Sequence, residues 1–181
     1  MNTDAIVLDA SAAIALIKGE SAGPEIAGIL RDSARRGGRR MVPDGFWLEV
    51  ANVLVRRYGR SPNEVVEAIR DIDDLDLESI RLDRTMLLVT IDIESRTGLS
   101  AYDAAYLALA EVEDGRLLSL DQQLIDAAGQ RAIRLADTSP RRSGEAPASH
   151  EANPIDWARF GPYLAQLRVE ALASGRRPTQ D

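Results

Sequence analysis

Apolar residues in this chain follow two alternating patterns, short continuous runs and longer segments with helical spacing. The runs have the length of strands, whereas apolar side chains in the segments between them recur every three or four positions, as in helices. We expect strands at residues 5–9, 39–43, 78–82, 116–120 and 132–135, and helices at 11–20, 22–36, 45–59, 61–75, 83–98, 100–115 and 121–129. This alternation predicts an α/β fold, a short parallel sheet flanked by helices on both faces.

Residues typical of helix ends support these boundaries. A side-chain oxygen just before a helix can accept hydrogen bonds from the free backbone N–H groups of the first turn. The N-terminal caps expected on this basis are Asp9 or Ser11, Asp44, Ser61, and Ser100 with Asp103 in capping-box spacing. Gly59 and Gly98 are expected to end the two helices that precede them.

The character of the chain changes near Thr138. Residues 138–154 are rich in Ser, Pro, Gly, Ala and charge, which is typical of a linker. Residues 155–181 regain amphipathic spacing but are too few to form a core alone. We therefore predict a domain at 1–137, a linker at 138–154 and a C-terminal amphipathic extension at 155–181, with the hypothesis that this extension packs on its own domain or on a second copy.

Composition excludes several kinds of chemistry. The chain of 181 residues has no cysteine, one histidine (His150) and a formal net charge of −7. Thiolate chemistry and cysteine-bound zinc are therefore impossible, and His150 lies in the predicted linker. The longest apolar run, residues 12–17, is far too short to span a bilayer, and the N-terminus lacks the positive charge of a signal peptide. We expect a cytoplasmic protein without membrane contact.

Four carboxylates stand out by position. Asp9 and Asp121 each follow a predicted strand at the turn into a helix, the edge of an open α/β sheet where ligands bind. Capping is the competing interpretation for both. Glu49 shares one narrow polar sector with Asn52 and Arg56 on an otherwise apolar helix, and a solvated stripe would explain that sector equally well.

Asp103 lies in a helix that is apolar almost all round, which predicts a buried helix. A buried, ionised Asp needs a partner. The backbone N–H of Ser100 could supply it through the capping box, which is the alternative to a functional role. If the four carboxylates converge, they repel one another by roughly 3 kcal/mol for each pair about 5 Å apart. Without His or Cys, such an all-oxygen site suits Mg²⁺ or Mn²⁺ and hence phosphoryl chemistry.

Four segments of the chain resemble a known family. "IVLDASAAIALI", "VPDGFWLEVANVL", "LSAYDAAYLALA" and "LLSLDQQLIDAA" resemble, in order and spacing, the four acidic motifs of PIN-domain ribonucleases, and most closely those of VapC toxins of bacterial toxin–antitoxin pairs. The resemblance covers residues 4–137. It implies a PIN-like three-layer fold, a nuclease domain at 1–137 and cleavage of RNA to a 5′-phosphate and a 3′-hydroxyl.

The resemblance also assigns residues, cofactor and partners. It makes Asp9, Glu49, Asp103 and Asp121 the catalytic and metal-binding carboxylates, with Ser11, Asn52 and Ser119 in supporting roles. Mg²⁺ or Mn²⁺ is the implied cofactor. RNA is the implied substrate, and a VapB-like antitoxin and a second copy in a homodimer are the implied partners. The extension after residue 137 departs from the family, whose members usually end there.

The sequence thus predicts a metal-dependent endoribonuclease toxin that hydrolyses RNA phosphodiester bonds with a metal-activated water. The arginines within 31–40 and 56–60 are candidate phosphate contacts. A non-catalytic PIN-like protein-interaction module is the alternative, since the acidic balance does not itself favour nucleic acid. A Mg²⁺-dependent phosphatase is a second alternative, within the enzymes.

Overall fold

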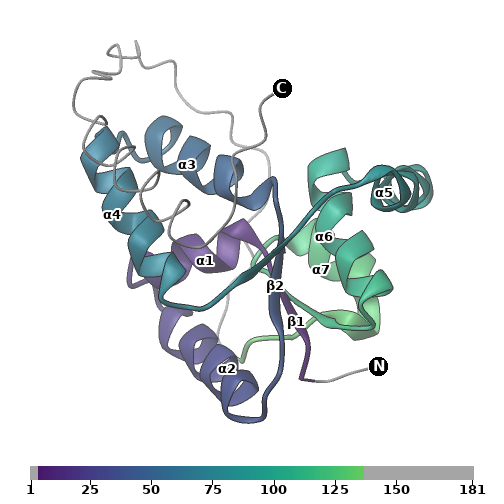
Figure 1. Ribbon diagram of the computed structural model, residues 1–181, viewed down its shortest axis with the longest axis horizontal. Helices are drawn as coiled ribbons and strands as arrows, with labels where there is room; N and C mark the ends of the chain where they lie inside the picture. The colour runs from purple at the N-terminus through teal and green to yellow at the C-terminus, as the bar shows by residue number, and fades with distance from the viewer. Residues whose placement is uncertain (1–3, 137–181) are drawn as a thin grey trace, which may run out of the picture. The chain divides into compact units, whose positions relative to one another are not determined.

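The computed structural model of the chain describes residues 4–136 (Figure 1). The linker and the amphipathic extension expected after residue 137 lie outside the described residues. Within 4–136, no helix is both long and apolar enough to cross a membrane.

Four short strands form one sheet. They are β1 (Ile6–Leu8), β2 (Arg40–Pro43), β3 (Glu78–Ile80) and β4 (Arg116–Leu118). Their order is β3-β2-β1-β4 and every neighbouring pair is parallel, with Val7 of β1 opposite Met41 on one side and Leu117 on the other. The chain leaves β1 towards β2, while β4 lies on the opposite side of β1. The carboxyl ends of β1 and β4 therefore flank the point where the connections diverge, the usual ligand site of such sheets.

Helices cover both faces of this sheet, as predicted. One layer consists of α1 (Ala10–Ile17), α2 (Gly23–Arg35), α3 (Phe46–Arg56) and α4 (Pro62–Asp73). The other consists of α5 (Arg84–Thr97), α6 (Ala101–Val112) and α7 (Gln122–Ala128) (Figure 1). The result is the three-layer α/β architecture that the sequence indicated.

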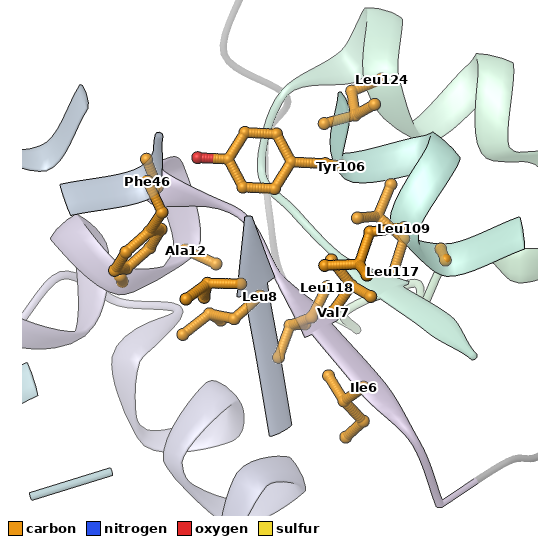
Figure 2. Packing of buried hydrophobic residues seen from close by; sticks show 14 of the residues in the cluster. Ile6, Val7, Leu8, Ala12, Phe46, Tyr106, Leu109, Leu117, Leu118 and Leu124 are labelled. Carbon is orange, nitrogen blue, oxygen red and sulfur yellow. The ribbon is translucent and has the colours of Figure 1, made fainter. Parts of the chain in front are cut away.

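The core fills the space between the strands and their nearest helices. Val7 and Leu8 of β1 are fully buried, and so are Leu117 and Leu118 of β4 (Figure 2). All seven residues from 104 to 110 of α6 are buried as well, which confirms the prediction of a helix enclosed on all sides. The ends of β1 and α6, which carry Asp9 and Asp103, are thus held by the most tightly enclosed parts of the molecule.

Most predicted caps are confirmed. Ser61 forms a reciprocal capping box with Glu64 at the start of α4, and Gly98 ends α5 in the left-handed conformation, with φ 73°. The predicted cap Asp44 is wrong. Gly45 occupies the position before α3 without a side-chain hydrogen bond. The chain already has helical geometry at Gly45, so Asp44 stands one residue too early to cap.

The expected strand at 132–135 is also wrong. A 3₁₀ turn over Gly129–Arg131 follows α7, so the chain reaches β4 only at Ala132. There it makes a single parallel bridge to Leu117, and the N–H of Ile133 donates to the Leu117 carbonyl at 2.7 Å. Arg134 is already exposed. The pairing with β4 therefore ends after one bridge, and residues 132–135 do not form a strand.

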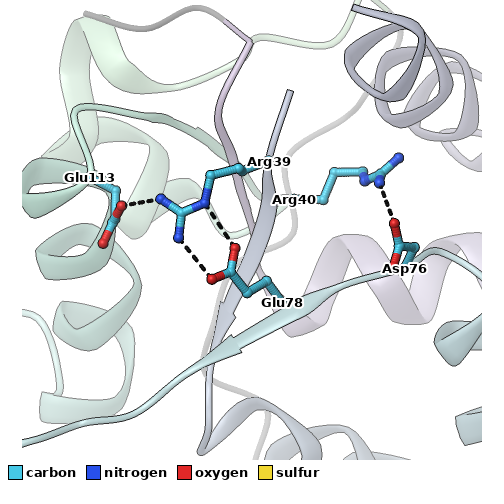
Figure 3. A network of polar contacts seen from close by, with 5 residues as sticks. All are labelled: Arg39, Arg40, Asp76, Glu78 and Glu113. Carbon is cyan, nitrogen blue, oxygen red and sulfur yellow. Dashed lines mark hydrogen bonds and ion pairs between the residues drawn. The ribbon is translucent and has the colours of Figure 1, made fainter. Parts of the chain in front are cut away.

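An ion-pair network ties together the opposite, amino-terminal edge of the sheet. Arg39 bonds both carboxylate oxygens of Glu78, at 2.8 and 2.9 Å, and also contacts Glu113 after α6 (Figure 3). These acids raise the pKa of Arg39 above its usual range. Arg40 pairs with Asp76 at 2.8 Å. The network connects β2, β3 and the turn before β4, on the side of the sheet away from Asp9.

Candidate functional site

Asp9 directly follows β1 and is only 3% exposed. Its Oδ2 accepts hydrogen bonds from the hydroxyls of Ser119, at 2.7 Å, and Ser11, and from the backbone N–H of Ser11 at 3.2 Å. Burial raises the pKa of Asp9, with a smaller contribution in the same direction from Asp103, while the two hydroxyls oppose the shift. Asp9 therefore caps α1 and also lies beside other acids, so capping does not exclude a place in the acidic group.

Ser11 and Ser119 connect Asp9 to the segment after β4. The Ser11 hydroxyl oxygen accepts from the N–H of Leu120, and the Ser119 hydroxyl oxygen accepts from the N–H of Asp121, each at 2.9 Å. Because each hydroxyl accepts from the backbone, its single proton is directed at the Asp9 carboxylate. The two serines thus lock the carboxyl ends of β1 and β4 together.

Glu49 lies in the first turn of α3 and is partly buried. The hydroxyl of Tyr106 on α6 donates to its Oε2 at 2.7 Å. Burial, followed by the charge of Asp9, raises the pKa of Glu49 to about 7, with smaller contributions from Asp103 and Asp121. Glu49 faces the sheet edge and α6, while Asn52, one turn further along α3, is exposed.

Tyr106 is the residue that sequence reasoning missed. Its ring is buried in the core, with the hydroxyl on the side that faces Phe46, the first residue of α3 (Figure 2). The hydroxyl of a buried tyrosine needs a hydrogen-bond partner. Its position one turn after Asp103 was the available signal, but nothing in the sequence identified Glu49 as the acceptor.

Asp103 lies in the first turn of α6 and is half-buried. Its N–H donates to the Ser100 hydroxyl oxygen at 3.2 Å, and the Ser100 hydroxyl donates to its Oδ2 at 2.7 Å. The partner of the carboxylate is therefore the side chain of Ser100, where the capping box had suggested its backbone N–H. Burial raises the pKa of Asp103, and the charge of Asp121 adds to the shift.

Asp121 caps α7 as the sequence suggested. Its Oδ1 accepts from the backbone N–H groups of Gln123, at 2.8 Å, and Leu124, at 3.0 Å. The same side chain contributes to the raised pKa values of Glu49 and Asp103. Capping α7 and belonging to the acidic group are again compatible.

The four acids form one electrostatically coupled group at the carboxyl edge of the sheet. Glu49 is affected by the charges of all three others, Asp9 by Asp103, and Asp103 by Asp121. In the arrangement described for residues 4–136, however, no three acidic or histidine side chains are grouped closely enough to hold a metal ion. Each of the four carboxylates is bonded to a neighbouring hydroxyl or backbone N–H.

The chemistry of this group fits a hard divalent cation. All its donors are carboxylate or hydroxyl oxygens, the ligands that Mg²⁺ and Mn²⁺ prefer. The raised pKa values record mutual repulsion and burial, and a cation would relieve that repulsion by favouring the ionised forms. The arrangement can thus attract a metal ion, and small side-chain rotations would have to bring its oxygens together.

Comparisons with known proteins identify the family of this fold. The family model of the PIN domain matches residues 6–130, which include all four acids. None of the curated proteins matches the chain by sequence.

Solved structures with the same fold include PAE2754 from Pyrobaculum aerophilum, at 20% identity and a TM-score of 0.53, covering 71% of this chain and 82% of that one. VapC20 from Mycobacterium tuberculosis, described as a sarcin–ricin loop cleaving toxin, is 18% identical, with a TM-score of 0.54 and coverage of 69% and 95%. A toxin–antitoxin complex from Klebsiella pneumoniae is 16% identical, with a TM-score of 0.52 and coverage of 72% and 97%. At these identities the likeness concerns the fold. With the family match over most of its length, the chain is a member of the PIN domain family.

Proposed function

We propose that this protein is a metal-dependent endoribonuclease of the VapC type, the toxin of a toxin–antitoxin pair. The observation that carries the proposal is the electrostatic coupling of Asp9, Glu49, Asp103 and Asp121 at the carboxyl edge of the sheet. Burial and the charges of neighbouring acids raise the pKa values of Asp9, Glu49 and Asp103, and a positively charged ligand would favour their ionised forms. The fold shared with VapC20 and with a toxin–antitoxin complex supports the biological role.

Each side chain has a role in this proposal. Asp9, Glu49 and Asp103 would hold Mg²⁺ or Mn²⁺, with Asp121 completing the site. The bound ion would supply a nucleophilic water at neutral pH and polarise the phosphate. Ser11 and Ser119 orient the Asp9 carboxylate through their directed protons. The hydroxyl of Tyr106 donates to Oε2 of Glu49 and fixes the orientation of this carboxylate. We assign Asn52, exposed beside Glu49, a supporting contact to RNA.

The proposed partners follow from the same role. RNA is the substrate, a VapB-like antitoxin inhibits the toxin, and the toxin acts in the cytoplasm as a homodimer. The extension at 155–181 is proposed to pack on its own domain or on a second copy. Deleting residues 139–181 tests that hypothesis. Unchanged stability, oligomeric state and activity would rule it out.

The central experiment uses the full chain purified away from any antitoxin. We expect it to cleave total RNA at defined sites with Mg²⁺ or Mn²⁺, and EDTA to abolish cleavage. Asp9→Asn and Asp103→Asn should each lose activity by more than about a hundredfold while remaining folded, because a carboxylate ligand becomes a neutral amide. Asp126→Asn, which changes an exposed acid on α7, is the matched control and should cleave normally.

A non-catalytic interaction module is the second candidate. It is favoured by the absence of a three-carboxylate cage within residues 4–136. Titration with Mn²⁺ separates the two functions. Metal binding without cleavage of any RNA would support the interaction module and contradict the nuclease. Metal-dependent release of phosphate from small phosphate esters, with RNA left intact, would instead indicate a phosphatase.

A further inference from the structure

Tyr102 is the one exposed aromatic residue in the part of the chain that the structure describes. Its side chain is 76% exposed, whereas Phe46 and Tyr106 are buried and Trp47 and Tyr58 are partly buried. It directly precedes Asp103 in the first turn of α6, a helix whose residues 104–110 are all buried. A large apolar ring is thus presented to solvent beside one of the four acids.

Arg56 lies on the other side of the acids, on α3. Arg56 is seven positions after Glu49. It therefore lies about 10 Å further along the helix, and its side chain leaves the helix axis within about 20° of the direction of the Glu49 side chain. Helical side chains lean towards the N-terminus, so the long Arg56 side chain extends back over Asn52 towards Glu49. Figure 1 shows α3 starting where β2 ends and running outward from the sheet, so this stripe leads away from the acids. Asn52 and Arg56 are both exposed.

Arg56 also differs in its ion pairing from most of the arginines that the sequence suggested as phosphate contacts. Among the candidate phosphate contacts of the sequence, five are ion-paired within the described residues: Arg35, Arg36, Arg39, Arg40 and Arg60. Residues 4–136 contain no acidic partner for Arg56. Its charge therefore remains available to a ligand on the same helix face as Glu49.

We propose that Tyr102 and Arg56 mark the two ends of the path along which a single-stranded RNA crosses the four carboxylates. Tyr102 stacks on a base next to the reacting phosphate, and Arg56 pairs with a backbone phosphate on the α3 side. This inference rests on the proposed ribonuclease function. It adds how an acidic protein with a net charge of −7 can hold a polyanion beside four carboxylates.

Stacking and phosphate pairing are the two contacts that single-stranded nucleic acid makes without sequence preference. The placement of one such group on each side of the acids favours RNA over a protein partner. A protein interface would bury the ring of Tyr102 but would not require an unpaired arginine along the stripe of Glu49.

The test measures RNA binding apart from cleavage. A fluorescein-labelled single-stranded RNA of mixed sequence is titrated with the full chain carrying Asp9→Asn, and fluorescence anisotropy gives Kd. Adding Tyr102→Ala should raise Kd about tenfold, and Tyr102→Phe should stay within about twofold because the ring is kept. Adding Arg56→Ala should lower the dependence of log Kd on log salt by about 0.7, which Arg56→Lys should restore.

Two matched controls lie away from the four acids. Val112→Ala removes an exposed apolar side chain at the far end of α6, and Arg116→Ala removes an arginine at the start of β4, on the amino-terminal edge of the sheet. Neither should change Kd or the salt dependence. Circular dichroism of each variant confirms that the fold is intact.

The outcomes separate this inference from the proposed function. If the unmodified chain cleaves RNA but Tyr102→Ala and Arg56→Ala bind as tightly as their parent, the RNA path is wrong and the nuclease stands. If Tyr102→Ala weakens only the complex with a co-purified protein, Tyr102 belongs to a protein interface and the inference is overturned. If the unmodified chain neither binds nor cleaves any RNA, both fail.

Discussion

The carboxylate of Asp9 accepts hydrogen bonds from two hydroxyl groups, those of Ser11 and Ser119. Ser119 is 1% exposed and gives its proton to Asp9 while accepting from the N–H of Asp121. Ser119→Ala would leave this buried carboxylate with one donor fewer and the Asp121 N–H without its acceptor. Since a hydrogen bond to a charged group contributes about 1.5–3 kcal/mol, we expect the free energy of unfolding to fall by about 2 kcal/mol.

Urea denaturation at pH 7 in EDTA measures this change. Ser95→Ala is the control, because Ser95 is exposed on α5 and its replacement should change the free energy of unfolding by less than about 0.5 kcal/mol. Equal stabilities for the two variants would mean that the Ser119 hydroxyl does not stabilise Asp9.

Glu49 links stability to pH. Its pKa is about 7 in the folded chain and 4.5 as an isolated side chain, so between these values the folded protein binds the proton more tightly than the unfolded protein. Stability is therefore full below about pH 4.5 and falls as pH rises through about 7. At about 1.4 kcal/mol per pH unit the loss is about 3 kcal/mol by pH 8. Asp9 and Asp103, whose pKa values are also raised, add to it.

Urea denaturation from pH 5 to pH 8 in EDTA tests this dependence. Glu49→Gln keeps an acceptor for the Tyr106 hydroxyl and should flatten the profile of the free energy of unfolding, leaving only the part due to the two aspartates. Millimolar Mg²⁺ should also flatten it in the unmodified chain, because a bound cation favours the ionised forms. A profile that rises with pH in EDTA would show that burial and the neighbouring acids do not raise the pKa values of these carboxylates in the folded chain.

Two glycines in helical segments should respond in opposite ways to the same substitution. Gly98 ends α5 at φ 73°, where a side chain is strained, and this turn leads directly to the Ser100 cap of α6. Gly28 lies inside α2, with open space where a Cβ would be. We expect Gly98→Ala to lower the free energy of unfolding by about 1 kcal/mol and Gly28→Ala to raise it by about 0.5–1 kcal/mol.

Thermal and urea denaturation of the two variants, each compared with the unmodified chain, measure both changes in the free energy of unfolding. A stabilising Gly98→Ala would mean that the turn between α5 and α6 does not need its left-handed residue.

At the scale of helices and strands, the sequence correctly predicted those features that depend only on residues close together in the chain. The Ser61 capping box, the Gly98 terminus and the apolar circumference of α6 are properties of neighbouring residues. The predictions of the Asp44 cap and of the strand at 132–135 were wrong because both required the exact residue at which an element begins or ends. A difference of one or a few residues in that position is enough to remove the cap or the strand.

The acidic group could be predicted only in part. Asp9 and Asp121 are placed by the parallel order of β1 and β4, which follows from the alternation of strands and helices. The contact between Tyr106 and Glu49 joins residues 57 positions apart, across two helix layers. No local pattern encodes such a pair, because it depends on how α3 and α6 meet over the sheet edge.

Across the whole molecule, the outer surface of α5 is where we expect the proposed homodimer to form. Leu87, Leu88 and Ile91 are 49%, 61% and 49% exposed, and Figure 1 shows α5 at the outside of its layer. A two-fold axis beside Leu88 would place Arg84 of each copy, four residues before it, opposite Asp92 of the other, four residues after it. Asp92 pairs with Arg96 of its own helix at 3.2 Å and would be shared with the second copy's Arg84 in this interface. Such a reciprocal contact is what a symmetric interface requires.

Charge exchange on α5 tests this dimer, with light scattering after gel filtration as the measurement. We expect Leu88→Arg to give monomers, since it places two like charges at the axis, and Arg84→Glu to weaken the dimer by at least tenfold. Arg84→Glu combined with Asp92→Arg should restore it, because the exchanged charges again face each other. Arg31→Ala on α2 is the control. A dimer that survives Leu88→Arg would exclude this face, and a dimer lost on deleting residues 139–181 would place the contact in the extension instead.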